Sequence, residues 1–303
     1  MHISVLLNES IEALNLKEDS IVVDATLGYA GHSSLILKRI RRGCLFAFDQ
    51  DGDAISYSKN KLQEIGDNFE IIKSNFCNMK KELEKRDVKH VDAILFDLGV
   101  SSPQLDEADR GFSYHMDAPL DMRMDREQEF SAYNVVNEYT EEQLADIFFR
   151  YGESKFSRSI AKNIVKNRPV KTTLELSEII KNSVPESVRR KKHPAKVIFQ
   201  AIRIEVNHEL DILEQSIKDA LNLLNIGGRC AVITFHSLED RIVKNIFNEV
   251  TNINPLVKGM PNIPEEYQAN FKIINKKIKP SKEELDNNNR SRSSTLRVIE
   301  RIK

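Results

Sequence analysis

The stretch DATLGYAGHS, residues 24–33, follows a short apolar run, IVV. A short apolar run that leads into a glycine-containing turn is typical of a buried strand that ends at a ligand site. The turn holds Gly28 and Gly31, but it lacks the third glycine of G-x-G-x-x-G, and no G-K-[ST] follows it. We therefore expect a ligand that is not held by its phosphate groups.

Strand and helix patterns alternate over the first part of the chain. The expected strands are IVVDATLG, LFAFDQD, FEIIKSNF and VDAILFDLG, and the helices between them are GHSSLILKRI, DAISYSKNKLQEIG and NMKKELEKR. Repeated βα units predict an α/β fold, in which a doubly wound, mostly parallel sheet is covered by helices on both faces.

A helical insertion follows, and the chain then returns to the sheet. Short helices are predicted at EEQLADIFFRYG, KFSRSIAKNIVKN and LELSEIIKNSV, the last opened by a capping box of Thr172 and Glu175. Apolar residues spaced three and four apart predict one long helix over 199–224, ended by the glycines at 227–228. RCAVITF, FKIINKKIK and STLRVIERI complete a sheet of six or seven strands. We expect 1–105 and 206–303 to form one domain and 106–205 an inserted helical domain.

Composition narrows the class of protein. The chain has 303 residues with a net charge of −1, and no apolar run approaches the roughly 18 residues of a membrane span. The first residues, MHISVLLNES, do not read as a signal peptide, so a cytoplasmic protein is predicted. Three widely spaced cysteines indicate reduced thiols. Basic clusters at 38–42, 189–196 and 288–294 together suggest contact with a phosphate backbone, although each alone is also typical of a solvated surface.

The residues that follow each expected strand are the candidates for ligand contact. Asp49 lies at the end of LFAFD, where a carboxylate can accept hydrogen bonds from both hydroxyls of a ribose, and this implies an adenosine; Asp51, in the turn beyond, is the weaker candidate. NAD and S-adenosylmethionine both present that ribose. With Ala30 in the loop and a single close backbone approach, at Gly31, S-adenosylmethionine is favoured. Phe76 lies either against the adenine or in the core.

A longer stretch is far more specific. FDLGVSSPQLDEADRGFSYHMDAPLDMRMD, residues 96–125, resembles the signature of the RsmH (MraW) family of bacterial 16S rRNA methyltransferases. HISVLL near the start, HPAKVIFQAIRIEVNHEL (193–210), ITFHSLEDRIVKNIF (233–247) and the closing NNRSRSSTLRVIER resemble that family in the same order.

The resemblance implies a Rossmann-like, S-adenosylmethionine-dependent methyltransferase domain with an inserted helical domain that recognises the substrate. It also implies N4-methylation of one cytidine in the decoding centre of 16S rRNA in the small ribosomal subunit. Carried over by position, the cofactor contacts fall on Ala30, Gly31, His32, Asp49, Phe76, Asp97 and Gln104. Two departures stand out: Ala30 replaces a usual glycine and could tighten the space beside the methionine moiety, and Ile3-Ser4 replaces the usual Thr-Pro.

The chemistry of such a transfer needs a hydrogen-bond acceptor. The exocyclic amine of cytosine is a poor nucleophile, and it must be held in line with the methyl group at about 3 Å while its N–H bonds are accepted. Asp97 is the candidate catalytic acceptor, although the resemblance makes it a cofactor contact, and it could serve both or only the cofactor. Methylation at C5 would need a cysteine nucleophile, and none lies in a Pro-Cys loop.

Other candidates concern the substrate. His236 either faces the target base or its phosphate or has a packing role, and its neighbours do not form a Ser-His-Asp triad. Arg203 and Asn207 lie on one polar flank of the long helix, and His193 and Arg292 are candidates for RNA contact. The scattered histidines predict no metal site. Two alternatives stay open, an NAD-dependent oxidoreductase and a non-catalytic RNA-binding assembly factor, as does the oligomeric state.

Overall fold

The computed structural model describes residues 4–190, 193–252, 257, 264 and 267–303. It divides the chain into two compact units, one formed by Met1–Gly99 with Asp211–Lys303 and the other by Val100–Leu210. The boundaries expected from the sequence are 105/106 and 205/206, whereas this division falls at 99/100 and 210/211. Among the described residues, no helix combines the length and the apolar character that crossing a membrane requires.

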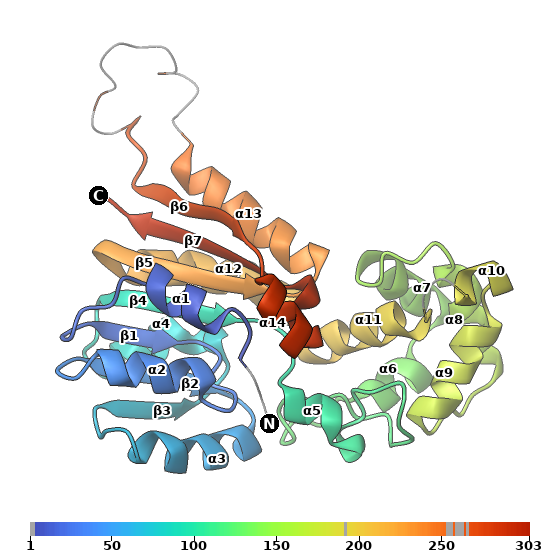
Figure 1. The fold of residues 1–303 in the computed structure, drawn as a ribbon. Helices are drawn as coiled ribbons and strands as arrows, with labels where there is room; N and C mark the ends of the chain where they lie inside the picture. The colour runs from blue at the N-terminus through green and yellow to red at the C-terminus, as the bar shows by residue number, and fades with distance from the viewer. Residues whose placement is uncertain (1–3, 191–192, 253–256, 258–263, 265–266) are drawn as a thin grey trace. The chain divides into compact units, whose positions relative to one another are not determined.

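The first unit is built on a seven-stranded sheet with the order β3-β2-β1-β4-β5-β7-β6 (Figure 1). The strands are β1 (Ile21–Asp24), β2 (Cys44–Asp49), β3 (Phe69–Lys73), β4 (Val91–Asp97), β5 (Leu224–Thr234), β6 (Phe271–Ile278) and β7 (Thr295–Arg301). Strands β1 to β5 pair in parallel, and β7 runs antiparallel to both β5 and β6. The expected α/β fold with a mostly parallel sheet is confirmed.

Two apolar cores cover the two faces of this sheet. Successive strand residues point to opposite faces, so Val22 lies in one core and Val23 in the other. Helices α1, α2 and α3 close the first core, and α4, α12 and α13 close the second. The helical segments of this unit are α1 (Leu7–Ala13), α2 (Gly31–Arg39), α3 (Gly52–Gln63), η1 (Phe76–Asn78), α4 (Met79–Glu84), most of α12 (Glu209–Leu223), α13 (Ser237–Thr251), α14 (Lys282–Asn287) and η5 (Asn289–Ser293).

A close approach at Gly43 sets the register of β1 and β2. A Cβ atom at Gly43 would lie 2.0 Å from the carbonyl oxygen of Ser20, so a larger residue would overlap the backbone. The amide of Cys44 donates to that same carbonyl at 3.2 Å, and Ile21 pairs with Cys44 at the start of the ladder. This register brings Asp49, at the end of β2, level with the loop that follows β1.

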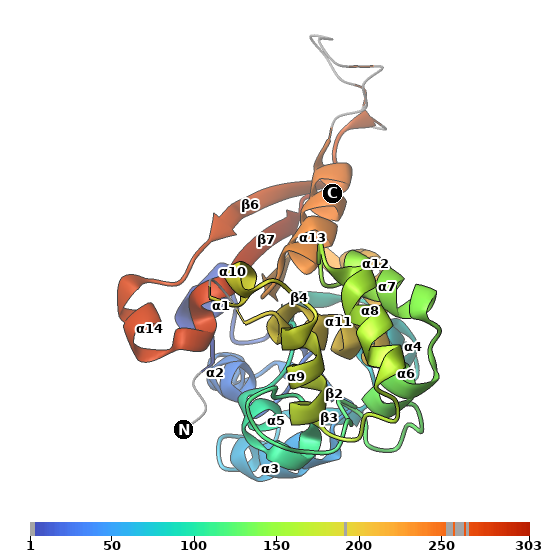
Figure 2. The same cartoon turned by 90° about the vertical axis from the view of Figure 1, so that its right-hand side faces the viewer.

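The second unit is helical. Its segments are α5 (Ser102–Asp106), η2 (Ala108–Arg110), α6 (Ala132–Glu138), α7 (Glu141–Arg150), α8 (Ser157–Lys166), α9 (Thr173–Asn182), α10 (Glu186–Arg189) and α11 (Ala195–Asn207). Helix α11 packs against α6, α7 and α9, and α8 lies beside both α7 and α9 (Figure 2). The predicted capping box is confirmed, because Thr172 Oγ1 accepts from the amide of Glu175 at 3.3 Å and Glu175 Oε2 accepts from that of Thr172 at 3.3 Å.

The prediction of one long helix over 199–224 is wrong. The chain forms α11 and α12 instead, separated at His208, whose φ of 51° is left-handed. Apolar spacing continues through the break, and periodicity does not report a reversal at a single residue. The glycines at 227–228 also do not end the helix, since β5 begins at Leu224 and they lie where its pairing with β4 is irregular.

The close packing at Gly43 predicts opposite effects for two glycine-to-alanine changes within the first unit. Gly43→Ala should lower the free energy of unfolding by at least ~2 kcal/mol, because the methyl group would overlap the backbone of Ser20. Gly52→Ala is the matched control: it opens α3 with nothing within 4 Å of a Cβ, so it should raise stability by about 0.5–1 kcal/mol. Urea denaturation measures both, and a shift of the same sign in both variants would contradict this account.

Candidate functional site

Three strands of the first unit end beside the point where the strand order reverses. The chain builds β1, β2 and β3 outward on one side and then returns with β4 on the other side of β1. Ligands of doubly wound sheets bind outside the carboxyl ends of the strands at such a switch point. Here the three strands end in aspartates: Asp24 on β1, Asp49 on β2 and Asp97 on β4.

The carboxylate of Asp49 joins the end of β2 to the loop that follows β1. Its Oδ2 accepts from the amide of Gly28 at 2.8 Å, and its Oδ1 accepts from the amide of Asp51 at 2.9 Å. Burial raises the pKa of Asp49 to about 6, against the lowering effect of these two hydrogen bonds. Each oxygen keeps a second lone pair, so the carboxylate can still accept two hydroxyl groups. The geometry fits the expected ribose contact.

Helix α3 braces the same loop from the other side. Ser58 Oγ donates to the carbonyl of Gly28 at 2.7 Å, and Lys61 Nζ donates to the carbonyl of Tyr29 at 2.9 Å. Gly28 has a φ of 49° and uses the left-handed region that glycine adopts without steric cost. Asp51, the weaker candidate from the sequence, caps α3 by accepting from the amide of Asp53 at 3.1 Å.

Ala30 and Gly31 open α2. The sequence predicted that both residues lie beside the cofactor, but other parts of the protein surround them. Ala30 has a φ of 54° and no exposed surface, so its methyl group packs in the core and does not line an open space. A Cβ atom at Gly31 would lie 1.7 Å from Ser4 Oγ, so the close approach at Gly31 is made by Ser4. Ser4 is one of the two residues, Ile3-Ser4, that replace the usual Thr-Pro of the family. Ile3 lies outside the described residues. The first amides of α2 have no intrahelical acceptors, which suits a carboxylate ligand.

Buried acidic side chains gather at the ends of β1, β4 and β5. Asp24 and Glu239 are 1% and 2% exposed. Burial raises the pKa of Asp97 well above its usual range, and the neighbouring charges of Asp24 and Glu239 raise it further. Asp97 Oδ2 lies 3.5 Å from His32 Nδ1, while Asp97 Oδ1 is buried and has no hydrogen-bond partner among the described residues. The cluster favours a cation or a hydrogen-bond donor beside Asp97.

Two hydroxyl groups hold this cluster in place. Thr26 Oγ1 accepts from the amide of Asp97 at 2.7 Å, and the amide of Thr26 donates to Asp24 Oδ1 at 3.1 Å. Ser33 Oγ, on α2, donates to Asp24 Oδ2 at 2.6 Å. Asp24, Thr26 and Ser33 were not among the site residues predicted from the sequence. Their only signal was position, since Asp24 ends the first expected strand and begins the stretch DATLG.

Phe76 lies beyond β3, in the 3₁₀ turn η1. Its ring packs edge-on against Phe96, with the ring centres 5.6 Å apart at 85°, and it stays partly exposed. One edge of the ring therefore belongs to the core. The remaining surface can contact an adenine, so this role stays a prediction.

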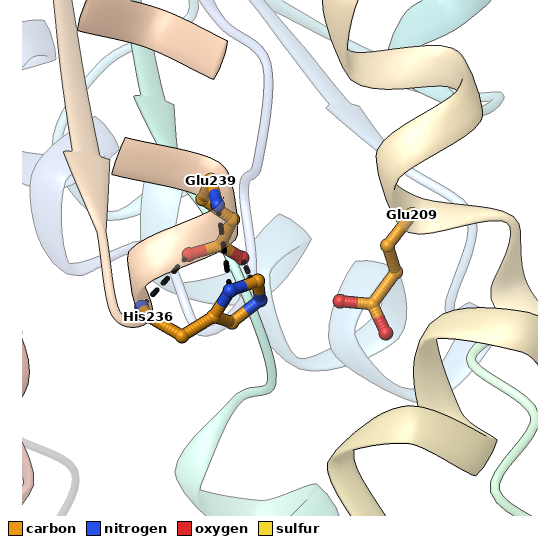
Figure 3. A group of neighbouring side chains, drawn as sticks. All are labelled: Glu209, His236 and Glu239. Carbon is orange, nitrogen blue, oxygen red and sulfur yellow. Dashed lines mark hydrogen bonds and ion pairs between the residues drawn. The ribbon is translucent and has the colours of Figure 1, made fainter. Parts of the chain in front are cut away.

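His236 caps α13, as Figure 3 shows. Its Nδ1 accepts from the amide of Glu239 at 3.4 Å, and Glu239 Oε2 accepts from the amides of His236 and Phe235 at 3.3 and 2.7 Å. His236 Nε2 lies 3.1 Å from Glu239 Oε1. These contacts show the packing role that the sequence left open, and contact with the substrate stays a prediction.

The polar flank of α11 is engaged inside the second unit. Asn207 Nδ2 donates to the carbonyl of Met122 at 2.8 Å, and Asn207 Oδ1 accepts from the amide of Met124 at 2.8 Å. Arg203 makes a two-pronged ion pair with Glu209, with both N···O distances at 2.8 Å. Asn207 therefore fixes the DMRMD segment of the signature, and its place as a substrate contact stays a prediction.

The remaining candidates divide between the units. Gln104, in the second unit, is buried and closes a capping box by accepting from the amide of Ser101 at 3.0 Å. His193 is exposed just before α11, and Arg292 is exposed in η5 of the first unit. The sequence missed Arg110, which is 2% exposed and donates to the carbonyls of Arg123 and Met124.

The α/β fold and the aspartates at its switch point fit a cofactor that carries an adenosine, and the family match gives the class of protein as a methyltransferase. The chain belongs to the MraW methylase family, which matches residues 1–302. This assignment confirms the expected family, the expected class of enzyme and S-adenosylmethionine as the methyl donor. It gives no support to the oxidoreductase alternative.

Close relatives cover the full length of the chain. A protein of Mycoplasma mycoides subsp. mycoides SC is 55% identical over 305 residues, with 99% of each chain covered. One of Exiguobacterium sibiricum is 52% identical over 307 residues, with 100% of this chain and 98% of the relative covered. Both are named ribosomal RNA small subunit methyltransferase H. Among solved structures, an rRNA methylase from Streptococcus thermophilus is similar over 100% of both chains, at 13% identity and a TM-score of 0.47.

The contacts of Asp49 predict a cofactor-binding defect that its neighbour does not share. Asp49→Asn removes the charge that would accept the ribose hydroxyls and weakens the hold on the loop, so the affinity for S-adenosylmethionine should fall about 10- to 100-fold. Asp51→Asn is the matched control, because asparagine caps a helix as well as aspartate does, and it should bind within about twofold of wild type. Isothermal titration measures both, and equal losses would show that Asp49 has no special role.

Proposed function

We propose that the chain transfers a methyl group from S-adenosylmethionine to the exocyclic N4 amine of one cytidine in the decoding centre of 16S rRNA. The site of action is the small ribosomal subunit in the bacterial cytoplasm. The names of the full-length relatives support an rRNA of the small subunit as the substrate. The observation on which the N4 reaction depends is the carboxylate of Asp97, which has a buried oxygen with no partner among the described residues.

The residues of the first unit fit S-adenosylmethionine. Asp49 offers a carboxylate for the ribose, and the amino end of α2 suits the carboxylate of the methionine moiety. Asp24, Asp97 and Glu239 favour positive charge, which suits the sulfonium and the ammonium. When bound, S-adenosylmethionine would supply an electrophilic methyl group and leave as S-adenosylhomocysteine.

Asp97 would act on the amine that receives the methyl group. Its carboxylate accepts an N–H bond of the amine, which orients the nitrogen lone pair toward the methyl carbon. Transfer of the methyl group would leave the amine nitrogen positively charged and acidic. Asp97 then takes the proton and later releases it to water. Burial, and after it the neighbouring carboxylates of Asp24 and Glu239, raise the pKa of Asp97, which makes it a stronger base for this step.

Each of the two units would have its own role in the reaction. The sheet unit holds the cofactor and the acceptor carboxylate, and the inserted helical domain of 106–205 recognises the RNA. Arg203, His193, His236 and Arg292 remain the candidates for substrate contact. In this assignment Asn207 acts by fixing the DMRMD segment rather than by touching the RNA.

The cysteines do not favour methylation at carbon. Cys230 is fully buried, and burial raises its pKa. Cys77 is exposed, but burial of its sulfur raises the pKa of this thiol as well, so the thiol form prevails at neutral pH. Attack on the cytosine ring needs a thiolate, which these surroundings disfavour.

Asp97→Asn should separate binding from chemistry. The substitution removes the proton acceptor but keeps the shape, so the single-turnover rate should fall about 10²- to 10⁴-fold. The affinity for S-adenosylmethionine, measured by titration, should fall much less. An equal loss of affinity and rate would mean that Asp97 serves the cofactor alone.

The raised pKa of Asp97 also sets the sign of two pH effects. Below this pKa the carboxyl group is protonated and cannot accept the proton, so the wild-type rate should rise with pH until Asp97 is ionised. Because the folded pKa lies above the unfolded value, the contribution of Asp97 to stability is lost as the pH rises through it. The Asn variant should lack both dependences and match or exceed the wild-type melting temperature at alkaline pH. A rate profile unchanged by the substitution would contradict the assignment.

The product identifies the reaction directly. Small subunits from a strain that lacks this enzyme are incubated with labelled S-adenosylmethionine, and the nucleosides of the 16S rRNA are analysed by mass spectrometry. We expect the label in N4-methylcytidine of the decoding centre, and Cys77→Ser should retain full transfer. Label in 5-methylcytidine, or none in 16S rRNA with wild-type enzyme that binds the cofactor, would refute the proposal.

A further inference from the structure

Four ring side chains come together on the second unit. Tyr114 stacks on His193 with ring centres 4.8 Å apart at 24°, and it lies 4.2 Å from His115. The ring of Phe199, which is buried in α11, meets Tyr114 edge-on at 5.7 Å. Tyr114 is partly buried, whereas His115 and His193 are exposed. The cluster therefore runs from the core of the unit to two imidazoles at its surface.

The exposed ring of His193 is held in one orientation. One face lies on Tyr114, and its Nδ1 accepts from the amide of Ala195 at 3.3 Å. Tyr114 is fixed in turn by Phe199, which is 3% exposed. Burial lowers the pKa of His193, and His115 and Lys181 lower it further, so the ring is largely neutral at pH 7. A flat ring that is already ordered loses little entropy when another ring stacks on it.

The charges around this cluster suit a phosphate. The sequence from 189 to 196, RRKKHPAK, is basic. Lys196 is exposed in the first turn of α11 and makes no ion pair with a described residue. Lys181, whose charge acts on His193, is paired with Glu178 at 3.2 Å. Aromatic faces beside lysines are the combination with which proteins bind single-stranded nucleic acid.

We propose that the Tyr114–His193 stack is a platform for one unpaired base of the RNA, with His115 at its edge and Lys196 beside the phosphate. The proposal rests on the proposed function in that the RNA is the substrate, and it assigns His193 to a base rather than to a phosphate. Bases inside a duplex have both faces covered, so the platform selects single-stranded RNA or a base turned out of a helix.

Two reciprocal variants of His193 separate stacking from helix capping. His193→Asn keeps an acceptor for the Ala195 amide but removes the ring, and His193→Phe keeps a ring but removes the acceptor. If the ring stacks on a base, His193→Asn should weaken binding of a short, fluorescein-labelled, single-stranded oligoribonucleotide about 5- to 100-fold. His193→Phe should bind within about twofold of wild type. Fluorescence anisotropy measures the affinities of the full-length proteins.

Three further measurements complete the test. Binding of the same sequence as a duplex should be equal in wild type and His193→Asn. The fluorescence of 2-aminopurine in the single strand should be quenched by wild type and less by His193→Asn. His115→Ala, whose ring makes no described hydrogen bond, should weaken binding of the single strand without altering the melting temperature, which keeps the test valid if a His193 variant folds poorly.

The outcomes distinguish this inference from the proposed function. If wild type methylates 16S rRNA but His193→Asn and His193→Phe bind the single strand equally, the platform is refuted and the methyl transfer stands. The reverse pattern, a loss of affinity in His193→Phe but not in His193→Asn, also overturns the platform. If wild type transfers no methyl group to rRNA while His193→Asn alone loses affinity for the single strand, the platform stands and the proposed function fails.

Discussion

The hydrogen bond from the Gly28 amide to the Asp49 carboxylate joins the loop after β1 to the end of β2, at the point where the order of the strands reverses. It depends on the register of β1 and β2, which the contact between Gly43 and Ser20 fixes far from the site. A residue with a side chain at Gly43 would push the strands apart, and the loop would lose its anchor. The position of the loop is therefore decided at the opposite end of the strand.

Burial gives the acidic residues at this point their chemistry. An exposed aspartate is ionised at neutral pH and is a weak base. Asp97 is surrounded by Asp24 and Glu239, which make its ionised form costly until a cation or a donor arrives. The same arrangement thus favours a positively charged cofactor and a carboxylate able to take a proton. Thr26 and Ser33 hold the acids without neutralising them.

The second unit shows how a long signature can be structural in part. Arg110 and Asn207 both bind the backbone of the DMRMD segment, one from η2 and the other from the end of α11. Their side chains are buried and engaged, so they shape the unit rather than reach outward. His115 and His193 of this unit have exposed rings instead. His193 stacks on Tyr114 and lies within the basic stretch of residues 189–196.

The sequence by itself determined the alternation of strands and helices, the strand-end positions of Asp49 and Asp97, and the family. These depend on local periodicity and on motifs read in order, which need no knowledge of distant contacts. It also identified the capping box at Thr172, because a cap is made within one turn.

Only the tertiary structure decided which residues act together. Asp24, Glu239 and Asp97 lie on separate strands and a helix, so their mutual effect on pKa has no sequence signal. The break at His208 was missed because it is a single-residue reversal inside an unbroken apolar pattern. Gly31 must be glycine because Ser4 approaches it closely, and these two residues belong to segments that are distant in the chain. Local patterns set the elements, and packing between distant segments set the chemistry.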